Sequence, residues 1–329
     1  MLKRGIVTSN EGSSLGDIFR DTARTLARDR VSASVITALR SAGVGAILLK
    51  GPSFAQWLYD DGTPRPYRDT DILLRDTHMP VAGGVLTNLG FERQPFTDLR
   101  QDKPWHAEDW LRTSDGARID LHRTLIGVAA PPPVAWSVLA TRTERARIGG
   151  ATVDVLAVDA RALHVALHAA QNGRRGTQAM TDLSRALDRL PLETWRAAAA
   201  LAGELGAESA MAVGLRLDPQ GAKVADRLGL TVSSSVQLRL QSSGAPGEAL
   251  GVAWFMQLPT RRAQAVWLLG KVLPPVAFMR VWEPGPERTP LEARATHQLP
   301  MAYAFRLLWL CARGPAAVRA WRRAQRWPA

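Results

Sequence analysis

Residues 65 to 74 read RPYRDTDILL, and this stretch decides the fold. Two acids, Asp69 and Asp71, lie two positions apart, and the apolar run after them predicts a buried strand from Thr70 to Leu74. Side chains two apart on a strand point to the same face, so the two carboxylates repel each other and need a cation. Magnesium fits best, because it prefers oxygen ligands and shares its shell with phosphates.

The residues before this stretch predict a phosphate-binding turn. AILLK, residues 46 to 50, indicates a buried strand, and Gly51-Pro52-Ser53 turns the chain into a short helix. The start of that helix presents free backbone N–H groups and a partial positive charge, to which Ser53 can add a hydroxyl. Lys50 ends the apolar strand, where its ammonium is of use beside phosphate. We therefore expect Lys50, Gly51 and Ser53 to bind the phosphates of a triphosphate.

Two arginines flank the acids. Arg65 and Arg68 follow a loop that the cluster DDGTP, residues 60 to 64, predicts. A guanidinium group can bind a phosphate through two parallel hydrogen bonds. We therefore expect both arginines to clamp phosphate beside the acids.

A third acid is expected next to the pair. Two strands joined by a hairpin are predicted over residues 108 to 113 and 117 to 122, and the second carries Asp120 between two apolar residues. A neighbouring strand can bring this acid beside the first two. Three such acids could hold two metal ions roughly 3.5 to 4 Å apart, the spacing used in phosphoryl transfer. His122, at the end of the same strand, is a candidate for substrate contact.

The rest of the chain is organised around this centre. Helices are expected over residues 17 to 42 and 80 to 89, and one further strand over 152 to 158. Beyond residue 159 the signals are almost wholly helical. The fold class is α+β, a small mixed-sheet core with flanking helices followed by a largely helical C-terminal region. The expected division is a flexible N-terminus (1–16), a catalytic domain (17–158) and a helical domain (159–329).

Two histidines, His164 and His168, lie four positions apart on a predicted helix. A pair at this spacing can ligate a metal, but the sequence offers no third ligand and the flanking residues are apolar. Helix packing, or a substrate contact through His168, is the favoured interpretation.

Composition excludes some classes of protein. The single cysteine, Cys311, excludes a disulfide framework and a cysteine-rich zinc site, and a reducing cytoplasm fits it. No apolar run follows the first residues, so we expect no signal peptide, and none is long enough to span a membrane. The net charge is +12, with 5 lysines among the 42 basic residues. This indicates either a GC-rich genome, the favoured interpretation, or a polyanion-binding surface. No RNA-binding motif is present, so nucleic acid is not favoured as a partner.

The C-terminal segment is unusual in its charge. From Arg306 onward it holds six arginines, no acid and three tryptophans, Trp309, Trp321 and Trp327. Arginine with tryptophan is typical of an interfacial helix on anionic lipid or of a polyanion-binding surface. It is also typical of a helix packed on a domain with its arginines pointing outward. Packing is favoured, and peripheral contact with an anionic membrane is the alternative.

Taken in order, the motifs resemble those of the DNA-polymerase-beta-like nucleotidyltransferase superfamily, and more closely a bacterial family of uncharacterised nucleotidyltransferases. The resemblance covers residues 20 to 190. The chain departs from the pattern in two respects, because Pro52 interrupts the Gly-Ser turn and the gap from the turn to Asp69 is longer than usual. The motifs that carry the resemblance are Leu49-Lys50-Gly51, Arg65-Pro66, Asp69-Thr70-Asp71-Ile72-Leu73-Leu74, Ile119-Asp120-Leu121-His122, His164-x-x-x-His168 and Thr181-Asp182-Leu183.

The resemblance implies an enzyme that moves a nucleoside monophosphate from a triphosphate, with ATP or GTP favoured, to an acceptor. It implies metal binding by Asp69, Asp71 and Asp120, and phosphate contact at Gly51 and Ser53. The expected cofactor is Mg²⁺, two ions, with Mn²⁺ as the alternative. The acceptor is a small molecule, sugar, peptide or protein, and tailoring of a ribosomal-peptide natural product is one such use. Two alternatives stay open: transfer of another group, such as phosphoryl or sugar, at the same site, and a non-catalytic nucleotide-binding regulator.

Overall fold

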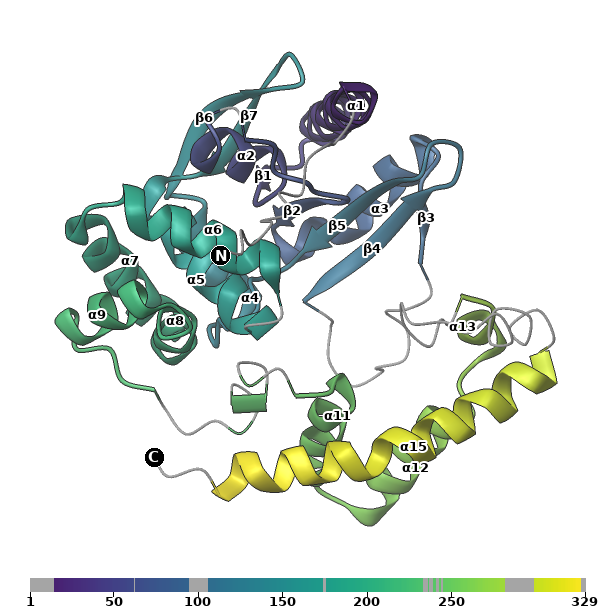
Figure 1. Ribbon diagram of the computed structural model, residues 1–329. Helices are drawn as coiled ribbons and strands as arrows, with labels where there is room; N and C mark the ends of the chain where they lie inside the picture. The colour runs from purple at the N-terminus through teal and green to yellow at the C-terminus, as the bar shows by residue number, and fades with distance from the viewer. Residues whose placement is uncertain are drawn as a thin grey trace, which may run out of the picture.

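The computed structural model describes residues 15–61, 63–94, 106–173, 176–232, 236, 239–240, 243, 245–281 and 299–326. The predicted N-terminal segment up to residue 14, and Trp327, lie outside the described residues. Figure 1 shows a sheet with helices packed against it, and a separate group of helices that ends in the long yellow helix.

The described strands form one mixed sheet of seven, made of β1 (Ala46–Leu48), β2 (Thr70–Leu74), β3 (Glu92–Arg93), β4 (Ala107–Arg112), β5 (Ala117–His122), β6 (Thr143–Ile148) and β7 (Ala151–Leu156). Their order across the sheet is β3-β4-β5-β2-β1-β7-β6. β1 runs antiparallel to β2 and parallel to β7, and β2 runs parallel to β5. The mixed-sheet core that the sequence predicts is therefore confirmed.

One face of the sheet is covered by α1 (Leu15–Ser41) and α3 (Met79–Asn88) (Figure 1). Successive residues of a strand point to opposite faces. In β2, Ile72 and Leu74 therefore enter the apolar cluster under α1 and α3. Asp71 points to the other face. This alternation decides on which side of the sheet the acids lie.

The other face is covered by α5 (Val158–Asn172), whose residues are buried almost all round. A helix that is buried on nearly every side lies inside the protein. Gly214 lets a neighbouring helix cross α5 closely, because a Cβ there would lie 1.9 Å from the carbonyl oxygen of Ala166. The helices that share this apolar cluster are α2 (Pro52–Leu58), α4 (Pro132–Leu139), α6 (Thr177–Arg189), α7 (Leu192–Leu205), α8 (Glu208–Leu215) and α9 (Pro219–Arg227).

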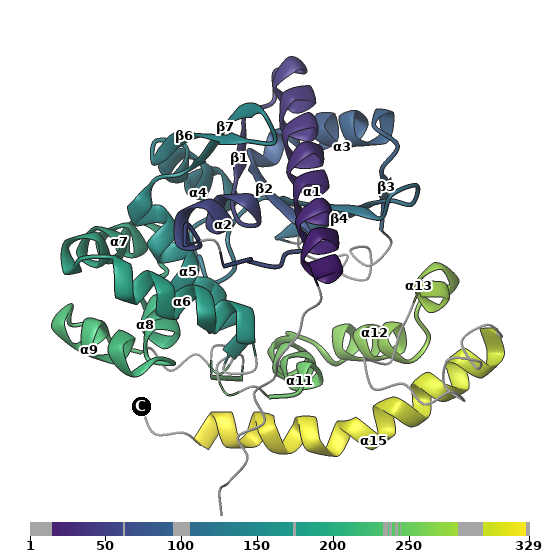
Figure 2. The same cartoon turned by 45° about the horizontal axis from the view of Figure 1, so that its top comes forward.

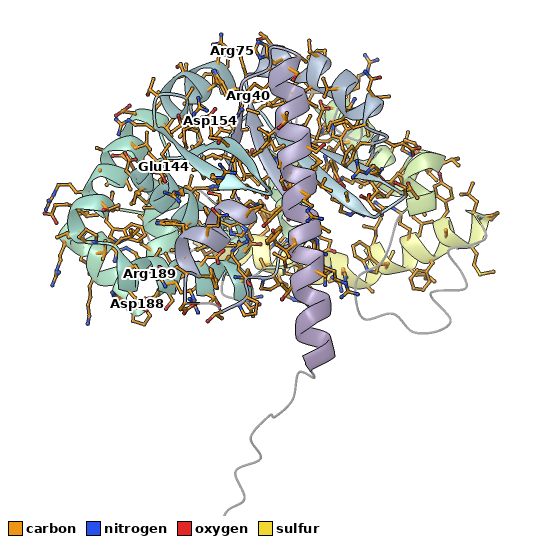
Figure 3. All side chains as sticks on the ribbon, turned by 90° about the horizontal axis from the view of Figure 1, so that it is seen from above. Arg40, Arg75, Glu144, Asp154, Asp188 and Arg189 are labelled. Carbon is orange, nitrogen blue, oxygen red and sulfur yellow. The ribbon has the colours of Figure 1, made fainter. Side chains whose placement is uncertain are left out.

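The β6–β7 hairpin is fastened to helices of both layers. Arg40, in the last turn of α1, donates a hydrogen bond of 2.9 Å to the carbonyl oxygen of Thr152 on β7. Gln56 of α2 donates one of 2.9 Å to the carbonyl oxygen of Arg147 on β6. Figure 3 labels Arg40 on α1 and Asp154 on β7. The hairpin thus links α1 on one face to α2 on the other.

Among the described residues, four further helices form a separate layer, with the long α15 lying along α11 in both views (Figures 1 and 2). Their core is small and rich in alanine, and includes Ala253 of α11 and Ala320 of α15. Within the described residues, no helix is long and apolar enough to cross a membrane. The helices are α11 (Gly247–Gln257), α12 (Arg261–Val272), α13 (Val276–Val281) and α15 (Leu299–Arg326).

Candidate active site

The strand register brings the predicted acids together. β2 and β5 are parallel neighbours in which Asp71 lies directly opposite Asp120. Asp69 immediately precedes β2 and lies two residues from Asp71. On the far side of β5, Asp109 of β4 is the partner of Asp120 in the ladder. Four carboxylates from three adjacent chain segments therefore lie at one place on the sheet.

A potential metal-binding cluster is centred on Asp71. The ligand atoms of Asp71, Asp120 and His122 all lie within 4.8 Å of one another. His122 Nε2 is 2.9 Å from Asp71 Oδ1, so His122 lies within the acid cluster, and its contact with substrate stays a prediction. Asp71 is buried and Asp120 half-buried. Asp69 is also half-buried and lies outside this group of ligand atoms.

Lys50 supplies a positive charge inside the cluster. Its Nζ is 2.9 Å from the same Oδ1 of Asp71, at the end of the strand next to β2. Burial alone would raise the pKa of Asp71, but Lys50 and His122 outweigh it and hold that pKa well below its usual range. Burial likewise opposes the charge of Lys50, while Asp71 and the neighbouring acids raise the pKa of the ammonium. The lysine expected on phosphate thus contacts an acid of the cluster.

The cluster holds more negative charge than its own cations neutralise. Burial, together with the charge of Asp71, raises the pKa of Asp120 to about 7. Burial also raises the pKa of Asp109, although Arg118 Nη1 lies 3.1 Å from its carboxylate. Oxygen donors in excess of nearby cations are the chemistry that a divalent cation satisfies. Asp71 and Asp120, with His122 beside them, therefore fit a bound divalent metal ion.

The predicted phosphate turn lies next to the acids. Gly51 has φ 65° and ψ −116°, a backbone conformation that glycine adopts without strain. A Cβ at this position would meet the backbone oxygen of Asp69 and the ring of Tyr67, both at 3.4 Å. Ser53, in the first turn of α2, is buried and its Oγ has no hydrogen-bond partner within the described structure. The turn is thus packed against the start of β2 and contains one buried hydroxyl without a hydrogen-bond partner in the described structure.

Arg65 forms an ion pair with an acid of α6, one of the helices packed around α5. Its Nε and Nη2 donate hydrogen bonds of 3.0 and 2.7 Å to the two carboxylate oxygens of Asp182 on α6. Tyr59 and Gln178 donate to the same carboxylate at 2.6 and 2.9 Å. Arg65 and Asp182 are both buried. The guanidinium group expected to clamp phosphate therefore already has a bidentate carboxylate partner, which sequence reasoning missed.

Arg68 differs from Arg65 in its surroundings. Its side chain is exposed and forms no ion pair with the part of the chain that the structure describes. It directly precedes Asp69. Of the two arginines, Arg68 is therefore the exposed one.

The two histidines of α5 lie on the side of the sheet that carries the acids. His164 packs edge-on against the ring of Phe54, with the ring centroids 5.4 Å apart. Burial and the charge of Lys50 lower the pKa of His168 to about 3, and they also lower the pKa of His164 well below its ordinary value. Both rings are therefore neutral at pH 7. The Nδ1 atoms of both are buried without a hydrogen-bond partner in the described structure.

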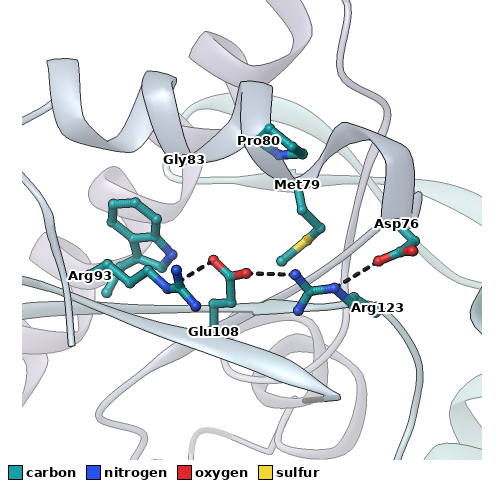
Figure 4. Close-up of a pocket in the computed structure, with 8 residues that line it drawn as sticks. Asp76, Met79, Pro80, Gly83, Arg93, Glu108 and Arg123 are labelled. Atoms are coloured by element: carbon teal, nitrogen blue, oxygen red, sulfur yellow. Dashed lines mark hydrogen bonds and ion pairs between the residues drawn. The ribbon is translucent and has the colours of Figure 1, made fainter. Parts of the chain in front are cut away.

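A cavity of about 460 Å³ lies on the opposite side of β4 from Asp109 (Figure 4). Glu108 is held there between Arg93 and Arg123, with N···O distances of 3.4 and 2.6 Å. Since Glu108 and Asp109 are successive strand residues, they point to opposite faces. This cavity is therefore separate from the acid cluster. Its lining residues are Asp76, Met79, Pro80, Gly83, Arg93, Glu108, Trp110 and Arg123.

Comparison with known proteins identifies one family. The sequence model of the family described as "Uncharacterised nucleotidyltransferase" matches residues 20–219. Among curated proteins none matches the chain. Among solved structures, the solution structure of an antibiotic-resistance factor, ANT(2'')-Ia, is similar with a TM-score of 0.39 and 14% sequence identity. The similarity covers 57% of this chain and 95% of that one.

Proposed function

The chain belongs to the uncharacterised nucleotidyltransferase family, and from this premise we propose that it moves a nucleoside monophosphate from ATP or GTP to an acceptor hydroxyl. The observation that carries the proposal is the register of β2 and β5, which sets Asp71 directly opposite Asp120. Two acids at this spacing, with Asp69 two residues before the first, suit a metal–phosphate centre.

We assign the metal to the acid cluster. Asp71 and Asp120 would hold it, with Asp69 at the edge of the site and His122 as a further ligand or as a partner that orients Asp71. A bound Mg²⁺ would neutralise charge on the triphosphate and on its leaving pyrophosphate. Mn²⁺ is the alternative ion, and the nitrogen of His122 suits it better than a set of oxygens alone.

The phosphates are assigned to the turn between β1 and α2. The positive φ of Gly51 directs the chain into α2, and Ser53 keeps a buried hydroxyl without a partner. Lys50 precedes Gly51 directly and contacts Asp71, so its ammonium links the turn to the acids. Arg68 is the exposed cation next to Asp69 and completes the phosphate set. Together these groups bind and orient the donor before transfer.

The acceptor proton is assigned to Asp120. Asp71 cannot readily take it, because its carboxylate is buried and engaged by Lys50 and His122. Asp120 is half-buried and forms no ion pair with a cation of the described residues, so its carboxylate can face an incoming hydroxyl. His168, neutral and with a free Nδ1, is proposed to contact the acceptor. The acceptor classes are those expected from the sequence, a peptide of a natural-product pathway among them.

Arg65 is proposed to position the site and not to bind phosphate. It stands in the loop that leads into β2, and Asp182 holds it from α6. Because Asp69 follows four residues later, this buried ion pair fixes the path of the chain into the acid cluster. Helix α6 therefore contributes to the geometry of the site.

The proposed function is tested by measuring which labelled phosphate of a nucleoside triphosphate is transferred to an acceptor. Purified protein is incubated with Mg²⁺ and with each NTP labelled at the α or the γ phosphate, with water, the protein itself and a panel of hydroxyl compounds as acceptors. Release of unlabelled pyrophosphate with transfer of the α label is the expected result. Transfer of the γ label would establish phosphoryl transfer instead, and NTP binding without any transfer would establish a regulator.

Asp71→Asn is the matched variant. It keeps the shape of the side chain and removes its charge, so turnover should fall by at least about a hundredfold. Asp188→Asn, at an exposed acid of α6, is the control and should leave turnover unchanged. Equal activity of the two variants would remove Asp71 from the mechanism.

A further inference from the structure

The positive charge of the chain is concentrated in its C-terminal helices. α11, α12, α13 and α15 together hold ten basic residues and one acid, Glu248, so they account for nine of the twelve net positive charges. A composition bias of the genome would spread arginine over the whole sequence. The concentration in one layer therefore indicates a surface for an anionic partner.

The long helix α15 places small residues inside and large ones outside. A helix turns by about 100° per residue, so residues seven or eight apart share a face. The inner face of α15 is buried and consists of alanines and Arg306. The opposite face is exposed and carries two large apolar residues, Met301 and Leu308, in its first half. Its second half carries the arginines. The exposed face consists of Met301, Leu308, Cys311, Arg319, Arg322 and Arg326.

The neighbouring α12 also leaves its large side chains outside. No residue of α12 is buried, and Val266 and Leu269 are 65% and 59% exposed. Arg306 Nε of α15 donates a hydrogen bond of 3.1 Å to the carbonyl oxygen of Lys271, which brings the end of α12 against α15. Monomeric proteins rarely expose this much apolar surface without a partner for it. We call the exposed faces of α12 and α15 the C-terminal basic surface.

We propose that the C-terminal basic surface binds the headgroup region of an anionic lipid bilayer. Aliphatic side chains beside arginines, without an acid on either helix, are the composition of a helix that lies in the membrane interface. Each basic residue near an anionic bilayer adds about 1 kcal/mol of attraction. The proposal is independent of nucleotidyl transfer, and it concerns the part of the chain beyond the matched family region.

Two other partners fit less well. Nucleic acid without sequence preference is bound through stacked aromatic side chains. Here Trp309 and Trp321 are half-buried against their own layer, and the exposed large side chains are aliphatic. A second copy of the chain would bring two such positively charged layers together, which repel each other.

The experiment is flotation of the full chain with vesicles. Vesicles of phosphatidylcholine alone are compared with vesicles that also contain phosphatidylglycerol, and the protein should float only with the second. Arg319→Gln, Arg322→Gln and Arg326→Gln combined should weaken binding roughly a hundredfold, because three interfacial charges are lost. Leu308→Gln should weaken it by a smaller factor, since one apolar side chain no longer enters the interface.

A control variant removes the same charge elsewhere. Arg30→Gln, Arg75→Gln and Arg227→Gln change three exposed arginines outside the C-terminal layer, and vesicle binding should stay at the wild-type level. Equal loss in both triple variants would show a net-charge effect and overturn the assignment. So would flotation with uncharged vesicles, or binding of RNA or DNA without binding of vesicles. Light scattering that shows a dimer held together by Leu308 would assign the surface to a second copy.

Discussion

Asp182, on α6, receives the guanidinium group of Arg65 across 117 positions of sequence, with Nη2 and Oδ2 2.7 Å apart in a buried environment. Burial would raise the pKa of Asp182, but Arg65 outweighs it and holds that pKa below its ordinary value. Each residue belongs to a different motif of the sequence. The ion pair joins the loop before the acids to α6. Its contribution to the free energy of unfolding can be measured.

Replacing only one residue of the Arg65–Asp182 pair should destabilise the protein strongly. Asp182→Asn or Arg65→Gln leaves one buried charge without its partner, and either should lower the free energy of unfolding by about 3 to 5 kcal/mol. The double variant Arg65→Met with Asp182→Leu should cost much less than the sum of the single variants. Urea unfolding of the four proteins measures this coupling. Additive costs would show that the two side chains act independently.

The same pair should influence catalysis through position. Arg65→Lys keeps the charge but loses the planar pair of donors, so the loop before Asp69 becomes less fixed. We expect kcat to fall while the KM for the NTP changes little, because the acids are displaced and the phosphate turn is not. If Arg65 instead bound phosphate, KM would rise with kcat nearly unchanged. Steady-state kinetics on refoldable, monodisperse protein separates the two roles.

His122 should affect the metal more than the nucleotide. Removing a side chain that ligates a metal, or that orients one of its ligands, typically lowers metal affinity 10- to 100-fold. His122→Asn should therefore raise the Mg²⁺ concentration needed for half-maximal activity by about that factor. A substrate contact would raise KM for the acceptor at saturating Mg²⁺ instead. Titration of activity with Mg²⁺ and with Mn²⁺ distinguishes these outcomes.

Gly51→Ala should damage both stability and nucleotide binding. The backbone conformation at Gly51 costs an alanine about 1 to 3 kcal/mol, and the new Cβ would come into van der Waals contact with Asp69 and Tyr67. Gly84→Ala is the matched control, because Gly84 lies in α3 with open space around its Cβ position. That change should stabilise the protein by about 0.5 to 1 kcal/mol. Equal thermal shifts in both variants would contradict the role of the turn.

The stability of the protein should fall below neutral pH through His168. Its pKa is about 3 in the folded chain, against roughly 6.5 for an unperturbed histidine. Between these values the unfolded chain binds a proton that the folded chain does not, so stability decreases as the pH falls. The contribution of one such group is about 1.4 kcal/mol per pH unit. His168→Gln should reduce the slope of unfolding free energy against pH by that amount, and an unchanged slope would show that this ring is not held neutral.

Much of the acid cluster could be predicted from the sequence, because its residues lie in regular strands. Thr70 to Leu74 and Ala117 to His122 have the predicted bounds, and the apolar residues around each acid fix the face it takes. The contact of Lys50 could not be predicted from the sequence in the same way. Its place at the end of a strand was predictable, but its contact with Asp71 depends on β1 lying next to β2.

The elements that the sequence did not predict have physical reasons. β6 lies at an edge of the sheet, and most of its residues are at least half-exposed, so it shows no apolar alternation. α4 begins at the proline run that predicted a break, although proline is also favoured in the first turn of a helix. The Arg65–Asp182 pair joins motifs that local patterns cannot connect. The division into domains at residues 158 and 159 stays a prediction.

The ion pair between Lys50 and Asp71 has a consequence for how the protein is handled. An acid centre that carries its own lysine does not depend on a metal ion to hold its shape while the chain folds. On the proposed function, the ion would then arrive with each nucleotide and leave with pyrophosphate. Purification in a chelating buffer should give a chain with an unchanged melting temperature, whose turnover returns as soon as the ion is added back.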